Sequence, residues 1–319
     1  SRTPVTIRTG YVDGLTVHLI DHGQLFRTRH PYGDENGPYP DNWRRYAIFA
    51  RTVLEGFGTL AFTPDVIHCL DWTAGLIPLV QKLEYSKRDH PASKPGTLFA
   101  IQNLAMQGSF EREVLPKIGI PHEYFRSIDG VELGARVNYL KAGAEFATMV
   151  SASSPSKARQ YVEAERGDGL EETFRRREKD IVGVQSGIDY RTWDPGSDPL
   201  LPHNYTPEDK ELNGKKKCKA ALQEAMKLEV APRTPLLAIV GRFDADSGFD
   251  ILAESLTPML ERNVEIILMG PGPPEIIERL HTIEQTFAGR CRVIEGYDVT
   301  TAHTLLAGAD MLLLPGHYH

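Results

Sequence analysis

The sequence has few of the features that mark several whole classes of protein. Among its 319 residues there are only three cysteines, Cys69, Cys218 and Cys291, which lie far apart and form no CxxC pair. This spacing argues against a disulfide framework or a zinc site, and it favours a reducing compartment: the cytoplasm, or a plastid if the source is a plant. No apolar run approaches the roughly 20 residues that cross a bilayer, and no apolar signal core opens the chain. We therefore expect no membrane partner.

An excess of positive charge is also absent. The chain has 36 Lys and Arg residues against 43 Asp and Glu residues, a net charge of -7. This balance gives no general electrostatic reason to bind nucleic acid. Neither the GxGxxG fingerprint of dinucleotide-binding folds nor a Walker A motif occurs. The dehydrogenase and P-loop NTPase classes are therefore disfavoured.

What the sequence does contain is a regular alternation of apolar strands and helical segments. In the first half, residues 64–72 (PDVIHCLDW) and 96–103 (GTLFAIQN) have the continuous apolar pattern of buried strands. In the second half, residues 236–243 (LLAIVGRF), 264–273 (VEIILMGPGP) and 311–315 (MLLLP) have the same pattern. Strands that are apolar on both faces belong to parallel sheets covered by helices. The sequence predicts an α/β fold.

The length and the connecting segments predict two domains. A chain of 319 residues is too long for one ordinary domain. Residues 181–189 (IVGVQSGID) read as a crossing strand, and the proline-rich residues 194–209 as an extended connector. We place the domains at 1–180 and 181–319. The charged residues 163–179 are expected to form an exposed loop and a solvated helix; their mixed sign argues against a nucleic-acid arm.

Several longer segments, which begin at PYGDENGPYPDN, carry a family resemblance. They are PDVIHCLDWTAGLIP, AIQNLAMQGSFEREVLPKIGIP, NYLKAGAEFATMVSASSPSKARQY, SGIDYRTWDPGSDPLLPHNY, GRFDADSGFDILAESL and GYDVTTAHTLLAGADMLLLP. In this order and with this spacing, the chain resembles the glycogen and starch synthases, which are retaining glucosyltransferases of glycosyltransferase family 5 with the GT-B fold. The resemblance covers nearly the whole chain.

The resemblance implies two Rossmann-like domains whose parallel sheets face each other across a cleft, each of them incomplete in this chain. The C-terminal domain would hold a nucleotide-sugar substrate, usually ADP-glucose, and the N-terminal domain the non-reducing end of an α-1,4-glucan. Glucose would be transferred with retention of configuration. Neither a metal nor another cofactor is implied, because cationic side chains and backbone amides stabilise the departing diphosphate. The donor nucleotide, the acceptor and the oligomeric state stay open.

Three sets of residues are candidates for the nucleotide-sugar side. Arg242, in GRFDADSG, matches the family's phosphate-contacting arginine, with a surface ion pair as the alternative. Gly270 and Gly272, in MGPG, would let backbone N–H groups approach a phosphate, with a tight structural turn as the alternative. Tyr297 matches the tyrosine near the adenine, with ordinary core packing as the alternative.

The candidates for the glucan side lie in the first half. Asp71 matches the acid of the family's HDW motif, which lines the sugar site; a cap or loop carboxylate is the alternative. Tyr32, in PYGD, matches a tyrosine of the active cleft, and Asn103 and Gln107, in QNLAMQG, fall in a cleft-lining segment. Asp71 and Arg242 are the residues that we expect to take part in catalysis.

Four departures from the family pattern bear on activity. Gln102 stands where the family has a histidine, Ser247 where it has a lysine, Ser186 where it has the asparagine of NGID, and His319 where it has a glutamate. The upstream KxGGL loop is absent, and we expect the natural polypeptide to be longer at both ends. Each lost charge-assisted contact costs about 1.5–3 kcal/mol.

These departures leave three hypotheses open. The chain is a divergent synthase with impaired activity, or a non-catalytic glucan-binding or scaffold paralogue, or a GT-B enzyme with a different donor or acceptor. The terminal histidines His317 and His319 are expected to be solvent-exposed rather than to bind a metal.

Overall fold

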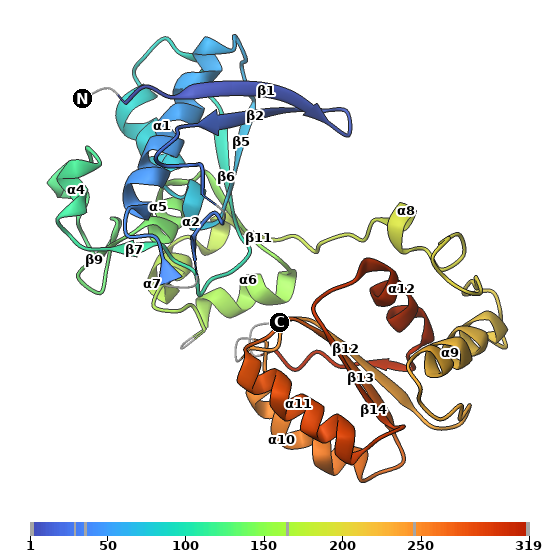
Figure 1. The fold of residues 1–319 in the computed structure, drawn as a ribbon. Coiled ribbons are helices and arrows are strands. Elements are labelled where there is room, and N and C mark those ends of the chain that lie inside the picture. Colours follow the sequence, from blue (N-terminus) through green and yellow to red (C-terminus); the bar gives the residue numbers. More distant parts are fainter. Residues whose placement is uncertain (1–2, 29, 35–36, 164–165, 245–246, 317–319) are drawn as a thin grey trace. The chain divides into compact units, whose positions relative to one another are not determined.

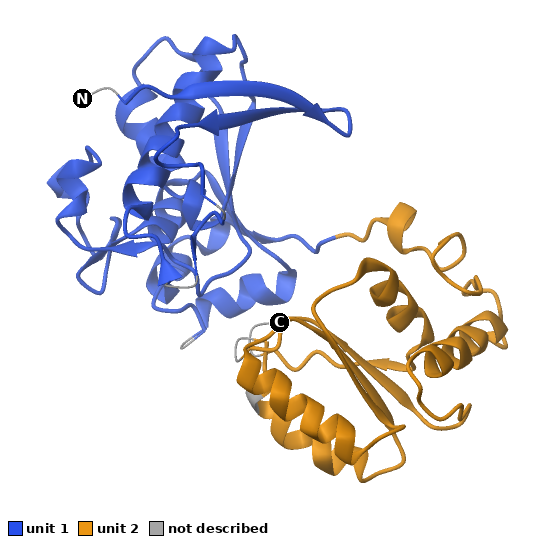
Figure 2. Ribbon diagram, in the orientation of Figure 1, with its two compact units in different colours: residues 1–186 blue, residues 187–319 orange. Residues whose placement is uncertain are grey.

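The structure, a computed structural model, describes residues 3–28, 30–34, 37–163, 166–244 and 247–316. The chain divides into two compact units, residues 1–186 and 187–319 (Figure 2). The division falls after the predicted boundary between residues 180 and 181. The reason is that β11 (Ile181–Gly183) pairs with β10 (Met149–Ala152) and so belongs to the sheet of the first unit.

The first unit is built on a four-stranded parallel sheet with the order β11-β10-β6-β5. Its other strands are β5 (Val66–Leu70) and β6 (Gly96–Ile101), which pair with Leu70 opposite Ala100. Both were expected from their apolar pattern. Because all neighbours run parallel, the carboxyl ends of the four strands meet at one edge of the sheet.

Helices pack on this sheet around one hydrophobic core (Figure 1). The large, fully buried side chains include Leu54, Phe99, Ile101, Tyr139 and Phe174. The helices of the unit are α1 (Asn42–Thr59), α2 (Asp71–Ala74), α3 (Leu76–Val80), η1 (Gln81–Tyr85), η2 (Pro91–Ser93), α4 (Val114–Lys117), η3 (His122–Tyr124), α5 (Tyr139–Phe146), α6 (Pro155–Val162), α7 (Glu171–Arg176) and η4 (Glu178–Asp180).

The first unit also contains smaller antiparallel sheets. The hairpin of β1 (Thr6–Val12) and β2 (Leu15–Asp21) turns at Asp13 and Gly14, whose φ angles are 49° and 79°. Two positive φ angles at a two-residue turn match the twist of an antiparallel pair. The other short strands are β3 (Gly33–Asp34), β4 (Gly37–Pro38), β7 (Ser109–Phe110), β8 (Glu132–Leu133) and β9 (Arg136–Asn138).

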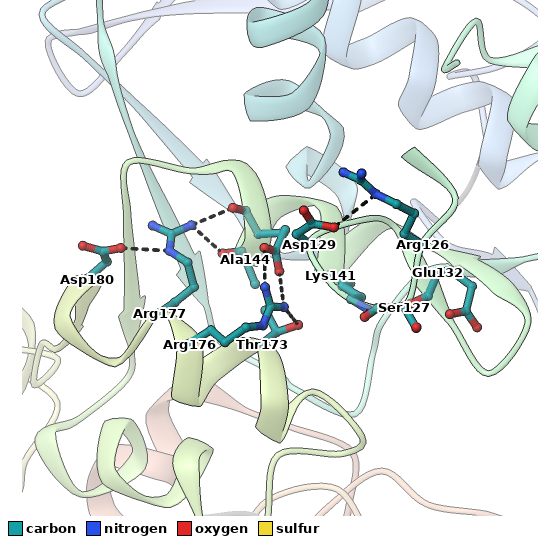
Figure 3. A network of polar contacts seen from close by, with 11 residues as sticks. Arg126, Ser127, Asp129, Glu132, Lys141, Ala144, Thr173, Arg176, Arg177 and Asp180 are labelled. Atoms are coloured by element: carbon teal, nitrogen blue, oxygen red, sulfur yellow. Dashed lines mark hydrogen bonds and ion pairs between the residues drawn. The ribbon is translucent and has the colours of Figure 1, made fainter. Parts of the chain in front are cut away.

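The prediction that residues 163–179 form only an exposed loop and a solvated helix is wrong. Leu170, which caps α7, and Phe174, within it, are fully buried, because their i, i+4 spacing puts both side chains on the inner side of this segment. The Tyr161 ring stacks on that of Phe174, with centroids 4.8 Å apart. Figure 3 shows the guanidinium of Arg177 at the end of α5, where it donates to the carbonyl oxygen of Ala144 at 2.9 Å. The charges of this segment therefore hold α7 against α5.

The second unit also has a four-stranded parallel sheet, with the order β14-β13-β12-β15. Its strands are β12 (Leu236–Val240), β13 (Glu265–Gly270), β14 (Cys291–Glu295) and β15 (Met311–Leu312). The chain runs outward from β12 to β14 and then returns to the other side of β12 as β15. Such a reversal of strand order opens a crevice at the carboxyl ends of the two strands that flank it.

The strands of the second unit alternate between two helical layers. Leu237 and Ile239 share a core with α10 (Phe249–Leu260) and α11 (Pro274–Thr286), whereas Leu236 and Ala238 share one with α9 (Asn213–Ala225) and α12 (Val299–Gly308). Figure 1 shows α10 and α11 on one side of the sheet and α9 and α12 on the other. The predicted α/β fold with parallel sheets is confirmed. None of the helices in the described ranges is long and apolar enough to span a bilayer. The unit also contains the short helix α8 (Tyr190–Trp193).

Candidate functional site

In the first unit, predicted site residues follow directly on two neighbouring strands. Asp71 comes after β5, and Gln102 and Asn103 come after β6. Because β5 and β6 are parallel and adjacent, these residues share the carboxyl edge of the sheet. Asp71 opens α2 with a φ of 53°, a left-handed conformation that an L-residue adopts at some cost. Backbone strain of this kind concentrates at functional sites.

The Asp71 carboxylate ties the two strand ends together. Its Oδ1 accepts hydrogen bonds from the backbone N–H of Gln102 at 2.8 Å and of Asn103 at 3.3 Å. Hydrogen bonds to an ionised acceptor are the stronger kind. Asp71 therefore links the start of α2 to the loop after β6 through its Oδ1. Its Oδ2, however, makes no hydrogen bond to any residue that the structure describes, so this oxygen can accept from a ligand hydroxyl.

A group of aromatic rings surrounds the next residue in the chain, Trp72. The Trp72 ring is buried and meets the Tyr46 ring edge-on at 4.7 Å and the Tyr32 ring at 6.0 Å. Tyr32 is 43% exposed, so its ring is the part of this aromatic group that a ligand can reach from solvent. Gly108 has a φ of 60°, and a Cβ there would lie 2.2 Å from the Trp72 ring. Only glycine lets the 102–108 loop approach the ring this closely.

The other two predicted glucan-side residues differ in what they contact. The Asn103 side chain turns back on its own loop, where Oδ1 accepts from the N–H of Ala105 at 3.0 Å. Gln107 reaches two other segments: its Oε1 accepts from Asn138 Nδ2 at 2.6 Å, and its Nε2 donates to the carbonyl oxygen of Asp168 at 2.9 Å. Gln107 therefore acts as a bridge within the first unit.

The sequence did not single out Asp168, whose carbonyl oxygen accepts from Gln107 of the loop after β6. Burial raises the pKa of the Tyr161 hydroxyl, and the negative charges of Asp71 and Asp168 raise it further. Asp168 has a φ of 48° and is exposed. The sequence Gly167–Asp168–Gly169 is a turn pattern that could have identified it, but this pattern lies within a strongly charged segment whose composition indicates an exposed loop.

In the second unit, the loop after β12 lies at the point where the strand order reverses. A Cβ on Gly248 would lie 2.2 Å from the carbonyl oxygen of Pro315, so the loop after β12 packs against the segment after β15. Arg242 is in this loop, with its side chain 68% exposed and Nε 3.2 Å from Asp244 Oδ2. Asp244 Oδ1 also accepts from the backbone N–H of Ser247 at 2.9 Å. The arginine is held by one carboxylate while most of its fork faces solvent.

The predicted glycines pack against this same loop. A Cβ on Gly270 would lie 1.7 Å from the carbonyl oxygen of Gly241, and one on Gly272 would lie 2.6 Å from Phe243 Cβ. Close packing of the strand ends therefore requires both glycines. The N–H of Gly296 donates to the Gly270 carbonyl oxygen at 3.0 Å.

The neighbour of Gly296, Tyr297, stands at the end of β14 and is 58% exposed. An exposed aromatic ring at a strand end is not core packing, and its face is open to a flat ligand. Five candidates of the second unit thus lie at or after the carboxyl ends of neighbouring strands of one sheet: Arg242, Ser247, Gly270, Gly272 and Tyr297.

Three candidates remain. Ser186 is exposed in the extended segment after β11. His317 and His319 lie outside the described residues. Within the described ranges, no group of three or more His, Cys, Asp or Glu side chains is arranged to hold a metal ion.

The fold and the two strand-end groups define a class of protein. Each unit is a parallel α/β sheet whose polar residues gather at the carboxyl ends of the strands, as in nucleotide-fold proteins that bind their ligands there. The model of the starch synthase catalytic domain family matches residues 2–176, more than half of the chain. The chain belongs to this family, and the resemblance seen in the sequence is confirmed.

Curated relatives and a solved structure agree with this assignment. The glycogen synthase of Anaeromyxobacter sp. (strain Fw109-5) is 35% identical over 96% of this chain, and that of Anaeromyxobacter dehalogenans (strain 2CP-C) is 37% identical over 95%. This chain spans 64% and 63% of their lengths. The catalytic domain of starch synthase IV from Arabidopsis thaliana, bound to ADP and acarbose, superposes with a TM-score of 0.85 at 29% identity over 98% of this chain and 64% of that one.

Proposed function

We propose that this chain transfers glucose from a nucleotide-sugar, ADP-glucose, to the non-reducing end of an α-1,4-glucan, with retention of configuration. The observation that carries the proposal is the Asp71 carboxylate, which joins the ends of β5 and β6 and keeps Oδ2 open, inside the region that matches the family model. Glycogen synthase relatives over most of the chain support it, as does the starch synthase neighbour bound to ADP and acarbose.

The acceptor glucan is assigned to the first unit. Asp71 Oδ2 would accept from a sugar hydroxyl, and the exposed Tyr32 ring beside Trp72 offers an apolar face to a pyranose ring. A carboxylate and an exposed aromatic ring suit a ligand with both hydroxyl groups and apolar C–H faces.

The nucleotide-sugar is assigned to the second unit. The Arg242 guanidinium would bind the diphosphate in bidentate fashion. It would then either leave Asp244 or contact both groups at once. The open face of Tyr297 would stack on the base. Neither a metal nor a cofactor is part of the proposal, because Arg242 and backbone N–H groups would stabilise the leaving diphosphate electrostatically.

The proposed compartment is the cytoplasm. Its support is the state of the cysteines, since Cys69, Cys218 and Cys291 are all free and buried. Free thiols persist where glutathione and thioredoxin keep them reduced.

One alternative has an observation in its favour. Gln102 and Ser247, which stand where the family has a histidine and a lysine, are both held by their backbone N–H groups, to Asp71 and Asp244. Both residues therefore have a backbone anchor that does not depend on the family's side chains, so the chain can bind glucan and nucleotide while transfer is slow or absent. A non-catalytic glucan-binding paralogue, or a GT-B enzyme with another donor, would share this geometry.

The direct test is incubation of the purified chain with radiolabelled ADP-glucose and glycogen. We expect label in glycogen that α-1,4-specific amylase releases, and at least about tenfold slower incorporation in Asp71→Asn. Retention on amylose resin without incorporation would establish the non-catalytic alternative. Thermal stabilisation by a different nucleotide-sugar, and not by ADP-glucose, would point to another donor.

A further inference from the structure

The amino-terminal turn of α5 is joined to the loop at the end of β6. The N–H of Tyr139 donates to the carbonyl oxygen of Gly108 at 3.1 Å, and that of Leu140 to the carbonyl oxygen of Gln107 at 3.0 Å. Asn138, at the cap position and 1% exposed, accepts the next N–H, that of Lys141, on its Oδ1 at 2.8 Å. These bonds satisfy three N–H groups that a helix leaves open at its start.

This cap fixes the direction of the Asn138 amide. Because Oδ1 must face the helix, Nδ2 faces the Gln107 side chain and donates to its Oε1 at 2.6 Å. Gln107 then has only its Nε2 to offer on the other side, and this group donates to the carbonyl oxygen of Asp168 at 2.9 Å. An amide has one donor end and one acceptor end, so each step determines the next.

This series of hydrogen bonds ends at a turn with left-handed backbone conformation. Asp168 and Gly169 have φ angles of 48° and 83°, and the N–H groups of Gly167 and Gly169 donate to Glu171 Oε1 at 3.0 and 3.4 Å. A residue kept in a left-handed conformation needs its surroundings to hold it there. Gln107 supplies the one side-chain bond to the Asp168 backbone among the described residues.

We propose that Asn138 is a positioning residue for the acceptor: it sets the orientation of the Gln107 amide, and through Gln107 it ties the Asp168 turn to the loop after β6, whose first two N–H groups bind Asp71, so that the Asp168 carboxylate contacts the bound glucan. This inference rests on the proposed function and adds to it a specificity-determining residue, Asp168. The relay touches only the first unit, so it acts on the acceptor and not on the nucleotide-sugar.

Two isosteric substitutions break the relay at different places. Asn138→Asp keeps the cap to Lys141 but puts an acceptor opposite Gln107 Oε1; the Gln107 amide then turns over and loses its bond to Asp168. Gln107→Glu keeps the bond from Asn138 but has no donor for the Asp168 carbonyl oxygen. Arg176→Gln is the matched control. It removes the paired bonds to Glu145, at 3.0 and 2.9 Å, which hold α7 to α5 (Figure 3) without touching the relay.

Two measurements on the 319-residue chain test the inference. Amide hydrogen exchange of residues 162–172 should accelerate around Asp168 in Asn138→Asp and Gln107→Glu. The KM for maltoheptaose should rise roughly three- to tenfold, the effect of about one neutral hydrogen bond, while the KM for ADP-glucose stays unchanged. Arg176→Gln should leave both KM values at the wild-type level. Asp168→Asn should raise the KM for maltoheptaose without accelerating exchange.

The outcomes separate the inference from the proposed function. Unchanged exchange at Asp168 in both relay variants overturns the relay, and equal KM values in all the variants overturn its role in acceptor binding. If the wild-type chain binds maltoheptaose but transfers no glucose, the transfer proposal fails and the dissociation constant, read from tryptophan fluorescence, replaces KM in the same comparison. A wild-type chain that binds no maltoheptaose overturns both proposals.

Discussion

Replacement of Asp71 separates its structural role from its proposed chemical role. In Asp71→Ala, the N–H groups of Gln102 and Asn103 lose their shared acceptor. Both residues are exposed, so water replaces the carboxylate, and each bond contributes about 0.5–1 kcal/mol. We expect the free energy of unfolding of the first unit to fall by about 1–2 kcal/mol, and its melting temperature by about 2–8 °C.

Asp71→Asn is expected to behave differently. Asparagine tolerates the φ of 53° and keeps an acceptor oxygen for both N–H groups, so the melting temperature should change by about 2 °C or less. The negative charge is lost, and with it a charge-assisted contact to the glucan worth about 1.5–3 kcal/mol. Transfer to glycogen should therefore fall about 10- to 150-fold in both variants.

The assay combines thermal unfolding with initial rates of glucose incorporation. Asp65→Asn is the control, because Asp65 is an exposed carboxylate just before the opposite end of β5. It should change neither quantity. The reasoning is refuted if Asp71→Ala is as stable as the wild type, since the hydrogen bonds would then be absent, or if Asp71→Asn transfers glucose at the wild-type rate.

Three further predictions concern the second unit. Arg242→Ala should weaken ADP binding about tenfold in calorimetry without changing the melting temperature, because the side chain is largely exposed; equal affinity would remove Arg242 from the donor site. Gly270→Ala would put a methyl group 1.7 Å from a backbone carbonyl oxygen of the next strand end and should destabilise the unit by about 3 kcal/mol or more in urea unfolding; wild-type stability would contradict the packing described. Hydrogen bonds from His281 to Glu295 and Glu284 raise the pKa of the imidazole. The stability that these bonds provide is therefore complete below about pH 6.5, the ordinary pKa of histidine. It is lost as the pH rises through the higher pKa of the folded state. His281→Gln should remove this pH dependence from urea midpoints measured between about pH 6 and 9, and an unchanged pH dependence would show that another group causes it.

The sequence predicted the parts of the fold that depend on local pattern. Continuous apolar runs marked β5, β6, β12 and β13, and their parallel pairing followed from burial on both faces. Asp71 and Arg242 could be placed at strand ends because each follows its apolar run directly. The confirmed family resemblance then gave these positions a chemical meaning.

Contacts between distant segments could not be predicted in this way. No local pattern shows that Asn138 meets Gln107, or that Gln107 meets Asp168, because each bond joins segments far apart in sequence and depends on how α5 and the 167–171 turn pack. The burial of Phe174 was also missed, because the charged residues around it indicate a solvent-exposed segment. One local signal was missed: Asp13–Gly14 between two alternating segments is a strong hairpin pattern.

The most direct test of the account is a titration of the isotopically labelled chain with maltoheptaose and, separately, with ADP, followed by the backbone amide resonances. The account predicts that maltoheptaose shifts the signals of Gln102, Asn103 and Asp168 in the first unit. It predicts that ADP shifts those of Arg242 and Tyr297 in the second unit. Shifts by maltoheptaose confined to other surfaces, or none at saturating concentration, would contradict the assignment of the Asp71 edge to the glucan.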